Sequence, residues 1–293
     1  MRDLKQSVRL ISRKVEVNGS SMHYLEAGEG SPVVFIHGMP TSSYLWRNIL
    51  PALGQHANCL AVDLIGMGQS SKPDIQYTVF DHVHYFENFI EELGLKNITL
   101  VMHGWCSVIG FEYARRHAAN VASVAFFESH IRPTTEWDML SLPVKQFASF
   151  LARPDAAYRA VVKQNYLVKK LLPSGVVARL SQTVLDEYER PFLEPQSRNV
   201  LWQYVQDLPL GHSRTEVVDL IEGYSSWLQQ VDIPKLMLYA VPGFITTIDT
   251  VCWAEANLPS LTLESLENVM HFAQESEPVQ FSEKLVNWYI ETH

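Results

Sequence analysis

The sequence predicts an α/β fold, in which a doubly wound, mostly parallel sheet carries an inserted helical cap. Short apolar runs alternate strictly with helical segments, which is typical of a parallel sheet covered by helices on both faces. The alternation stops over residues 130–212, where prolines separate helical segments and no strand-like run stands out. A chain of 293 residues suits one large domain with such an insertion. We expect a core of residues 1–129 and 213–293 and a cap of residues 130–212.

The expected strands are short apolar runs that end in turns. The first two form a hairpin around Asn18-Gly19, a pair of residues favoured in two-residue turns. The strands are expected at residues 15–17, 22–27, 32–36, 59–64, 98–102, 121–127, 235–240 and 261–266. The core helices are expected at residues 43–53, 78–94, 107–117, 216–229, 249–258 and 279–291.

Composition indicates a globular protein and excludes several classes. Hydrophobic residues make up 47% and charged residues 19%, which argues against disorder. The net charge of −9, without runs of Lys or Arg, argues against nucleic acid or a membrane as a partner. Three scattered cysteines favour neither a disulfide framework nor a metal site, so we expect a reducing, cytoplasmic location and no metal. No signal peptide or apolar run of about 18 residues is evident.

Four short segments follow expected strands, at the edge where open α/β sheets bind their ligands. They are His37-Gly38-Met39-Pro40, His103-Gly104-Trp105-Cys106, Phe127-Glu128-Ser129 and Asn268-Val269-Met270-His271. With HGMPTSSYLWRNILP, DLIGMGQSSKPD, AFFESHIRP, ERPFLEP and DIPKL, they resemble the α/β-hydrolase fold and, within it, the haloalkane dehalogenases. The resemblance runs in order from about residue 15 to the C-terminus. It is strongest to the branch whose triad acid is a Glu.

The resemblance implies a catalytic site from which one member is missing. The dehalogenase nucleophile is an Asp in an H-D-W-G segment, and the corresponding residue is Gly104, which cannot form an ester. His271 takes the position of the base and Glu128 that of the acid that orients it. Trp105 matches one of two halide donors, whereas the second, an Asn, is replaced by Met39.

The remaining groups suit chemistry that needs no covalent intermediate. The peptide N–H groups of Met39 and Trp105 are expected to form an oxyanion hole. We therefore predict cofactor-independent acid–base chemistry on a hydrophobic small molecule, such as isomerisation, cyclisation, C–C bond formation or a lyase reaction. Two alternatives stay open: a dehalogenase or related hydrolase inactivated at its nucleophile, and a binding protein without turnover.

Several neighbouring residues have a structural interpretation beside a functional one. Cys106 lies on the first turn of a helix and is interpreted as a packing thiol. His37 and His103 are interpreted as structural hydrogen-bonding groups. The expected pocket-lining side chains are aromatic: Phe127, Phe147, Phe150, Phe244 and Phe272. The oligomeric state does not follow from the sequence.

Overall fold

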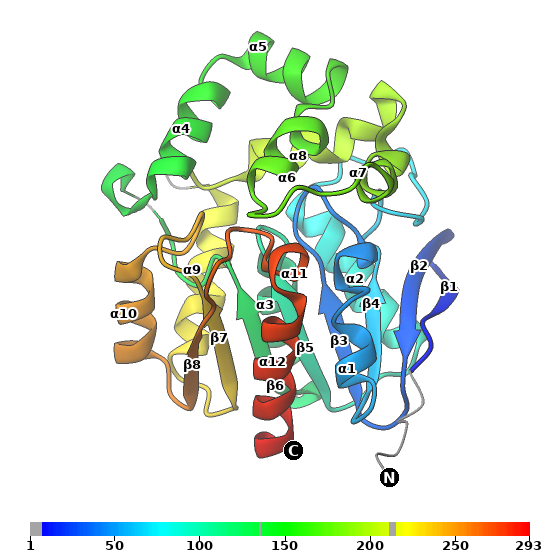
Figure 1. The fold of residues 1–293 in the computed structure, drawn as a ribbon, viewed down its shortest axis with the longest axis vertical. Coiled ribbons are helices and arrows are strands. Elements are labelled where there is room, and N and C mark those ends of the chain that lie inside the picture. The colour runs from blue at the N-terminus through cyan, green and yellow to red at the C-terminus, as the bar shows by residue number, and fades with distance from the viewer. Residues whose placement is uncertain (1–7, 135, 211–214) are drawn as a thin grey trace.

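One twisted sheet runs through the core of the computed structural model, which describes residues 8–134, 136–210 and 215–293 (Figure 1). Its strand order in the described chain is β1-β2-β4-β3-β5-β6-β7-β8. The β1–β2 hairpin and the β2–β4 pair are antiparallel, and the other neighbours are parallel. The predicted doubly wound, mostly parallel sheet is confirmed.

Most strands coincide with the expected apolar runs, whereas β1 begins at Ile11, four residues before the expected start at residue 15. Asn18 and Gly19, between the first two strands, both have positive φ (51° and 71°), as a tight hairpin turn requires. The central strand β5 is buried at every position, which explains its largely apolar sequence without apolar–polar alternation; its two polar residues, Thr99 and His103, are buried as well. The strand bounds are β1 Ile11–Val17, β2 Ser20–Ala27, β3 Pro32–Ile36, β4 Asn58–Val62, β5 Ile98–His103, β6 Val121–Phe127, β7 Lys235–Tyr239 and β8 Leu261–Ser265.

Core helices cover both faces of the sheet (Figure 1). Helices α1 and α12 lie on one face, and α2, α3 and α9 lie on the other. The core helices are α1 Leu50–Leu53, α2 Val79–Glu92, α3 Ser107–Arg116, α9 Glu216–Leu228, α10 Ile248–Asn257, α11 Ala273–Ser276 and α12 Pro278–Thr292. The helix expected over residues 43–53 is wrong as one element. It divides into a 3₁₀ turn, Ser43–Trp46, and the short α1, whose first turn contains Pro51. Proline has no N–H for a continuous helix.

The segment between β6 and α9 forms a layer of helices above one end of the sheet (Figure 1). Its helices are α4 Leu142–Leu151, α5 Pro154–Tyr158, α6 Leu172–Ser174, α7 Gln182–Glu189 and α8 Asn199–Asp207, joined by short 3₁₀ and π turns. Prolines occupy the first turns of α4, α5 and α6, where a missing N–H costs nothing. The predicted cap boundary at residues 212 and 213 lies outside the described residues. Among the helices described, none combines the length and apolarity needed to cross a membrane.

Candidate active site

A histidine–glutamate pair lies at the carboxyl end of the sheet. His271 follows β8 and Glu128 follows β6, and the Nδ1 atom of His271 is 2.9 Å from the Oε2 atom of Glu128. Both residues are buried, with exposed fractions of 8% and 1%. Because a carboxylate accepts hydrogen bonds, the proton of a neutral imidazole is held on Nδ1 and Nε2 is left as the basic nitrogen. The predicted pair is therefore brought together in the fold.

The Glu128 carboxylate is held by peptide groups as well as by the imidazole. The N–H groups of Phe244 and Ile245 donate to Oε2 over 2.9 Å and 2.6 Å, and that of Thr246 donates to Oε1 over 3.3 Å. Gly243 makes this approach possible, since a Cβ there would come within 2.4 Å of Oε1. Converging N–H donors stabilise a buried negative charge and fix its orientation. The loop after β7 thus supplies no carboxylate of its own. Its N–H groups at residues 244–246 form a cradle for the carboxylate of Glu128.

Gly104 lies at the turn between β5 and α3 with a φ of +63°. A Cβ atom built there would lie 3.5 Å from the Nε2 atom of His271 and 3.3 Å from the Cα atom of Gly38. Any side chain at this position would therefore point at the basic nitrogen of the pair. The next residue but one, Cys106, is fully buried, and burial raises the pKa of its thiol to about 12. A thiol in this state is a poor nucleophile, in agreement with its predicted packing role.

A largely apolar pocket opens beside the pair, with about 650 Å³ of empty space that includes open solvent. Core and cap both line it, with Met39, Trp105, His130, Leu140, Val144, Phe147, Leu171, Gly175, Leu208, Pro209, Leu210, Phe244, Ile245, His271 and Phe272. Three of the five predicted aromatic residues, Phe147, Phe244 and Phe272, are among them. The oxyanion hole expected from the peptide N–H groups of Met39 and Trp105 stays a prediction.

Two predicted pocket residues lie elsewhere. Phe127 is fully buried on β6, where its ring packs against His103 and Phe281 with centroid distances of 5.9 Å and 6.0 Å. Phe150 stacks on Phe147 and on Tyr166 within the cap. Both are packing residues. For Phe127 the reason is strand alternation, which directs successive side chains to opposite faces of the sheet.

The histidines that precede the turns are structural, as predicted. The Nε2–H group of His103 donates to the carbonyl oxygen of His271 over 2.7 Å and so fixes the loop that carries His271. Burial lowers the pKa of His103 well below its usual value, which keeps it neutral. The Nε2 atom of His37 accepts a hydrogen bond from the N–H group of Leu64.

Two features of this site are not predicted from the sequence. His130, which follows Glu128 by two positions, lines the pocket, and its ring lies 5.2 Å from that of Trp105. The sequence places His130 just after a strand but does not indicate that its side chain lines the pocket. The cap contact of Phe244 was also missed: the hydroxyl of Ser141, at the N-terminus of α4, donates to its carbonyl oxygen. The Pro-Gly pair before Phe244 was the available sign of a close backbone approach.

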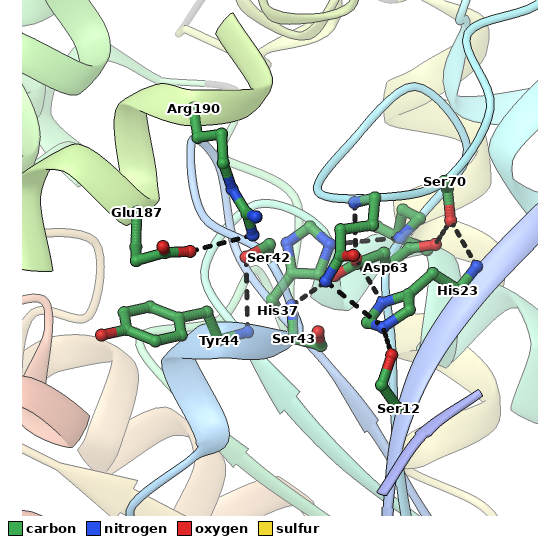
Figure 2. Close-up of polar contacts among 12 residues, drawn as sticks. Ser12, His23, His37, Ser42, Ser43, Tyr44, Asp63, Ser70, Glu187 and Arg190 are labelled. Atoms are coloured by element: carbon green, nitrogen blue, oxygen red, sulfur yellow. Dashed lines mark hydrogen bonds and ion pairs between the residues drawn. The ribbon is translucent and has the colours of Figure 1, made fainter. Parts of the chain in front are cut away.

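A second group of polar side chains lies beneath the cap, apart from the pocket (Figure 2). The Nδ1 atom of His23 is 2.7 Å from the Oδ2 atom of Asp63, and its Nε2 atom is 2.8 Å from the Ser12 hydroxyl. Asp63 also accepts N–H groups from Ser43 and Gln69. Burial opposes ionisation of Asp63, but these hydrogen bonds outweigh it and lower its pKa. The alignment resembles a Ser–His–Asp triad, yet it joins β1, β2 and two loops, so we interpret it as a structural brace.

Comparison with known proteins agrees with this architecture. Residues 31–278 match the family model described as alpha/beta hydrolase fold. A haloalkane dehalogenase of Agrobacterium fabrum is 36% identical over 270 residues, covering 92% of this chain and 88% of that protein. A haloalkane dehalogenase of Bradyrhizobium diazoefficiens is 33% identical, covering 97% and 96%.

Solved structures give the same result. The crystal structure of the haloalkane dehalogenase DatA from Agrobacterium tumefaciens C58 superposes with a TM-score of 0.91 at 34% identity, covering 97% of both chains. That of DbeA from Bradyrhizobium elkani USDA94 gives a TM-score of 0.93 at 29% identity, covering 97% of this chain and 99% of that one. The fold, the order of its elements and these identities together show that this chain belongs to the haloalkane dehalogenase-like family of the α/β-hydrolase fold.

Proposed function

We propose that this protein is an acid–base enzyme that acts on an apolar small molecule without a covalent intermediate, with His271 and Glu128 as its proton-transferring pair. The observation that carries the proposal is the environment of the His271 Nε2 atom. The group that faces it from the turn after β5 is Gly104, which has no side chain to attack carbon. The pair itself keeps its hydrogen bond and its buried carboxylate.

Such a pair supports a proton transfer that balances within the substrate. The Nε2 atom removes a proton from a carbon beside a carbonyl group, and the electron pair moves onto the carbonyl oxygen. The imidazolium, stabilised by Glu128, then returns the proton to the same or another carbon, which gives exchange or isomerisation. General acid–base catalysis of this kind is worth about 10²–10⁴ in rate.

The proposal is tested with a probe that needs a base and no nucleophile. Kemp elimination of 5-nitrobenzisoxazole breaks a C–H and an N–O bond and releases a coloured cyanophenolate, so one general base in an apolar pocket suffices. We expect the protein to accelerate this reaction and His271→Ala to lower the rate at least about a hundredfold. His56→Ala, at an exposed histidine outside the pocket, is the matched control and should leave the rate unchanged.

The hydrolytic alternative is measured in parallel as halide release from 1-bromobutane. Halide release by the unaltered protein that is abolished by His271→Ala would overturn the proposal. Gly104→Asp, alone and combined with Met39→Asn, asks whether the site becomes a dehalogenase when a carboxylate is placed beside His271. If the unaltered protein shows neither reaction, or if elimination survives His271→Ala, the pair is not a catalytic base and the site is a binding site.

A further inference from the structure

His130 is a buried polar residue in the pocket to which the acid–base mechanism gives no role. It is 8% exposed, and within the part of the chain that the structure describes neither ring nitrogen has a hydrogen-bond partner. Its backbone is nevertheless fixed. The N–H group donates to the Ser107 hydroxyl over 3.4 Å, and the carbonyl oxygen accepts from the Tyr224 hydroxyl. The ring is thus placed at the pocket wall by its neighbours.

Trp105 presents a second polar atom of the same kind. Its indole Nε1–H group is buried and has no acceptor among the described residues. The two rings meet edge to face, with a centroid distance of 5.2 Å and an interplanar angle of 86°. Leaving a buried donor without an acceptor costs about 1–3 kcal/mol, so unpartnered polar atoms on two contacting rings of the pocket lining suit a polar ligand atom.

The protonation state of His130 defines what it can offer. Burial, together with the nearby His271, lowers the pKa of the His130 imidazole to about 4. The ring is therefore neutral at pH 7 and presents one N–H donor and one acceptor nitrogen. A neutral imidazole that donates a hydrogen bond can polarise a carbonyl group without transferring a proton to it. His130 and His271 accordingly differ in role within one pocket.

We propose that His130 and Trp105 form a two-donor contact for an oxygen atom of the ligand, so that the pocket selects apolar compounds carrying a carbonyl or phenolic oxygen. The rest of the lining, including Val144, Phe147 and Leu171, accommodates the apolar part of such a compound. The inference gives the substrate class of the function proposed above and rests on it for the chemical step only. Ligand selection itself needs no turnover.

Two ligands of nearly equal shape test the contact. 2-Acetylnaphthalene carries a carbonyl group where 2-isopropenylnaphthalene carries a methylene group, and the dissociation constants of both are measured by equilibrium dialysis. We expect the ketone to bind the unaltered protein at least as tightly as the hydrocarbon. In His130→Phe, which keeps the aromatic contact with Trp105, the affinity ratio should shift about tenfold toward the hydrocarbon, which corresponds to about 1.4 kcal/mol.

Further variants separate the hydrogen bond from shape. His130→Asn retains an N–H donor, so its affinity ratio of ketone to hydrocarbon should lie between those of His130→Phe and the unaltered protein. Trp105→Phe should shift it in the same direction as His130→Phe. Phe147→Leu, a change in the apolar lining, is the control and should alter both affinities equally. Near-ultraviolet circular dichroism checks that each variant is folded.

The proposal is overturned if His130→Phe shifts the ratio less than twofold, if Phe147→Leu shifts it as much, or if the unaltered protein binds neither compound. The two proposals fail separately. Kemp elimination by the unaltered protein, together with a ligand ratio that His130→Phe leaves unchanged, refutes the oxygen contact alone. A ratio that shifts in His130→Phe, in a protein whose unaltered form shows no Kemp elimination, refutes the acid–base function alone.

Discussion

Replacing Glu128 with Gln probes how the carboxylate cradle supports His271, the base of the proposed function. Four N–H donors converge on Glu128, from His271 and from residues 244–246. The best placement of Gln keeps its carbonyl oxygen where Oε2 lies, facing three of these donors. Its NH₂ group then meets the N–H group of Thr246, whose present contact of 3.3 Å is the longest. One buried donor therefore loses its acceptor, and the other hydrogen bonds lose the negative charge.

The magnitude follows from these contacts. An unsatisfied buried donor costs about 1–3 kcal/mol, and a charge-assisted hydrogen bond is about twice as strong as a neutral one. We expect Glu128→Gln to lower the free energy of unfolding by about 2–4 kcal/mol and the Kemp elimination rate about a hundredfold, because the imidazolium loses its stabilising charge. Glu264→Gln, at a surface ion pair with Lys284, is the control and should change stability by less than about 1 kcal/mol.

Denaturant unfolding and the Kemp assay measure the two effects separately. A variant that loses stability and keeps an elimination rate within threefold of the original would show that Glu128 only holds the fold. A variant with unchanged stability would refute the reasoning about the cradle, because the lost hydrogen bonds would then have no net value.

Three other predictions concern the wider structure. Only one of the three thiols should react with iodoacetamide in the native protein at pH 8, since Cys252 is exposed whereas Cys59 and Cys106 are buried with raised pKa values; mass spectrometry counts the adducts. Asp63→Asn should lower the free energy of unfolding at pH 7 by about 2–4 kcal/mol, measured in urea. Because folding lowers the pKa of this carboxyl, the difference from the unaltered protein should be full above about pH 4 and should shrink as the pH falls below that; a constant difference contradicts this. Gly243→Ala should lower both the melting temperature and the Kemp rate, because its Cβ would lie 2.2 Å from a backbone oxygen and 2.4 Å from the catalytic carboxylate; an unchanged rate counts against the cradle.

The sheet was predictable because burial leaves a direct trace in the sequence. A strand such as Ile98–His103, covered on both faces, is largely apolar, and that pattern locates it within a residue or two. The helix expected over residues 43–53 contains Pro51, which has no N–H to continue the preceding turn and lies instead in the first turn of a separate short helix.

The part of the site that could be predicted consists of ionisable side chains in the turns that follow strands. His271 and Glu128 come together because both follow strands that end at one edge of the sheet. The placement of His130 depends on backbone hydrogen bonds that its N–H group donates to Ser107 and its carbonyl oxygen accepts from Tyr224, and both partners are distant in sequence. The cradle of residues 244–246 uses peptide N–H groups, and these are the same in every sequence except at proline.

Phe244 joins three parts of the molecule that the chain order keeps far apart. Its N–H group donates to Glu128, its carbonyl oxygen accepts from Ser141 in the cap, and its side chain lines the pocket. A shift of α4 or of a bound ligand therefore cannot leave the hydrogen bonds of Glu128 unchanged. Through one residue, filling of the pocket and position of the cap are linked to the hydrogen bonds that hold Glu128 beside His271, so a ligand that orders the cap would also order this pair.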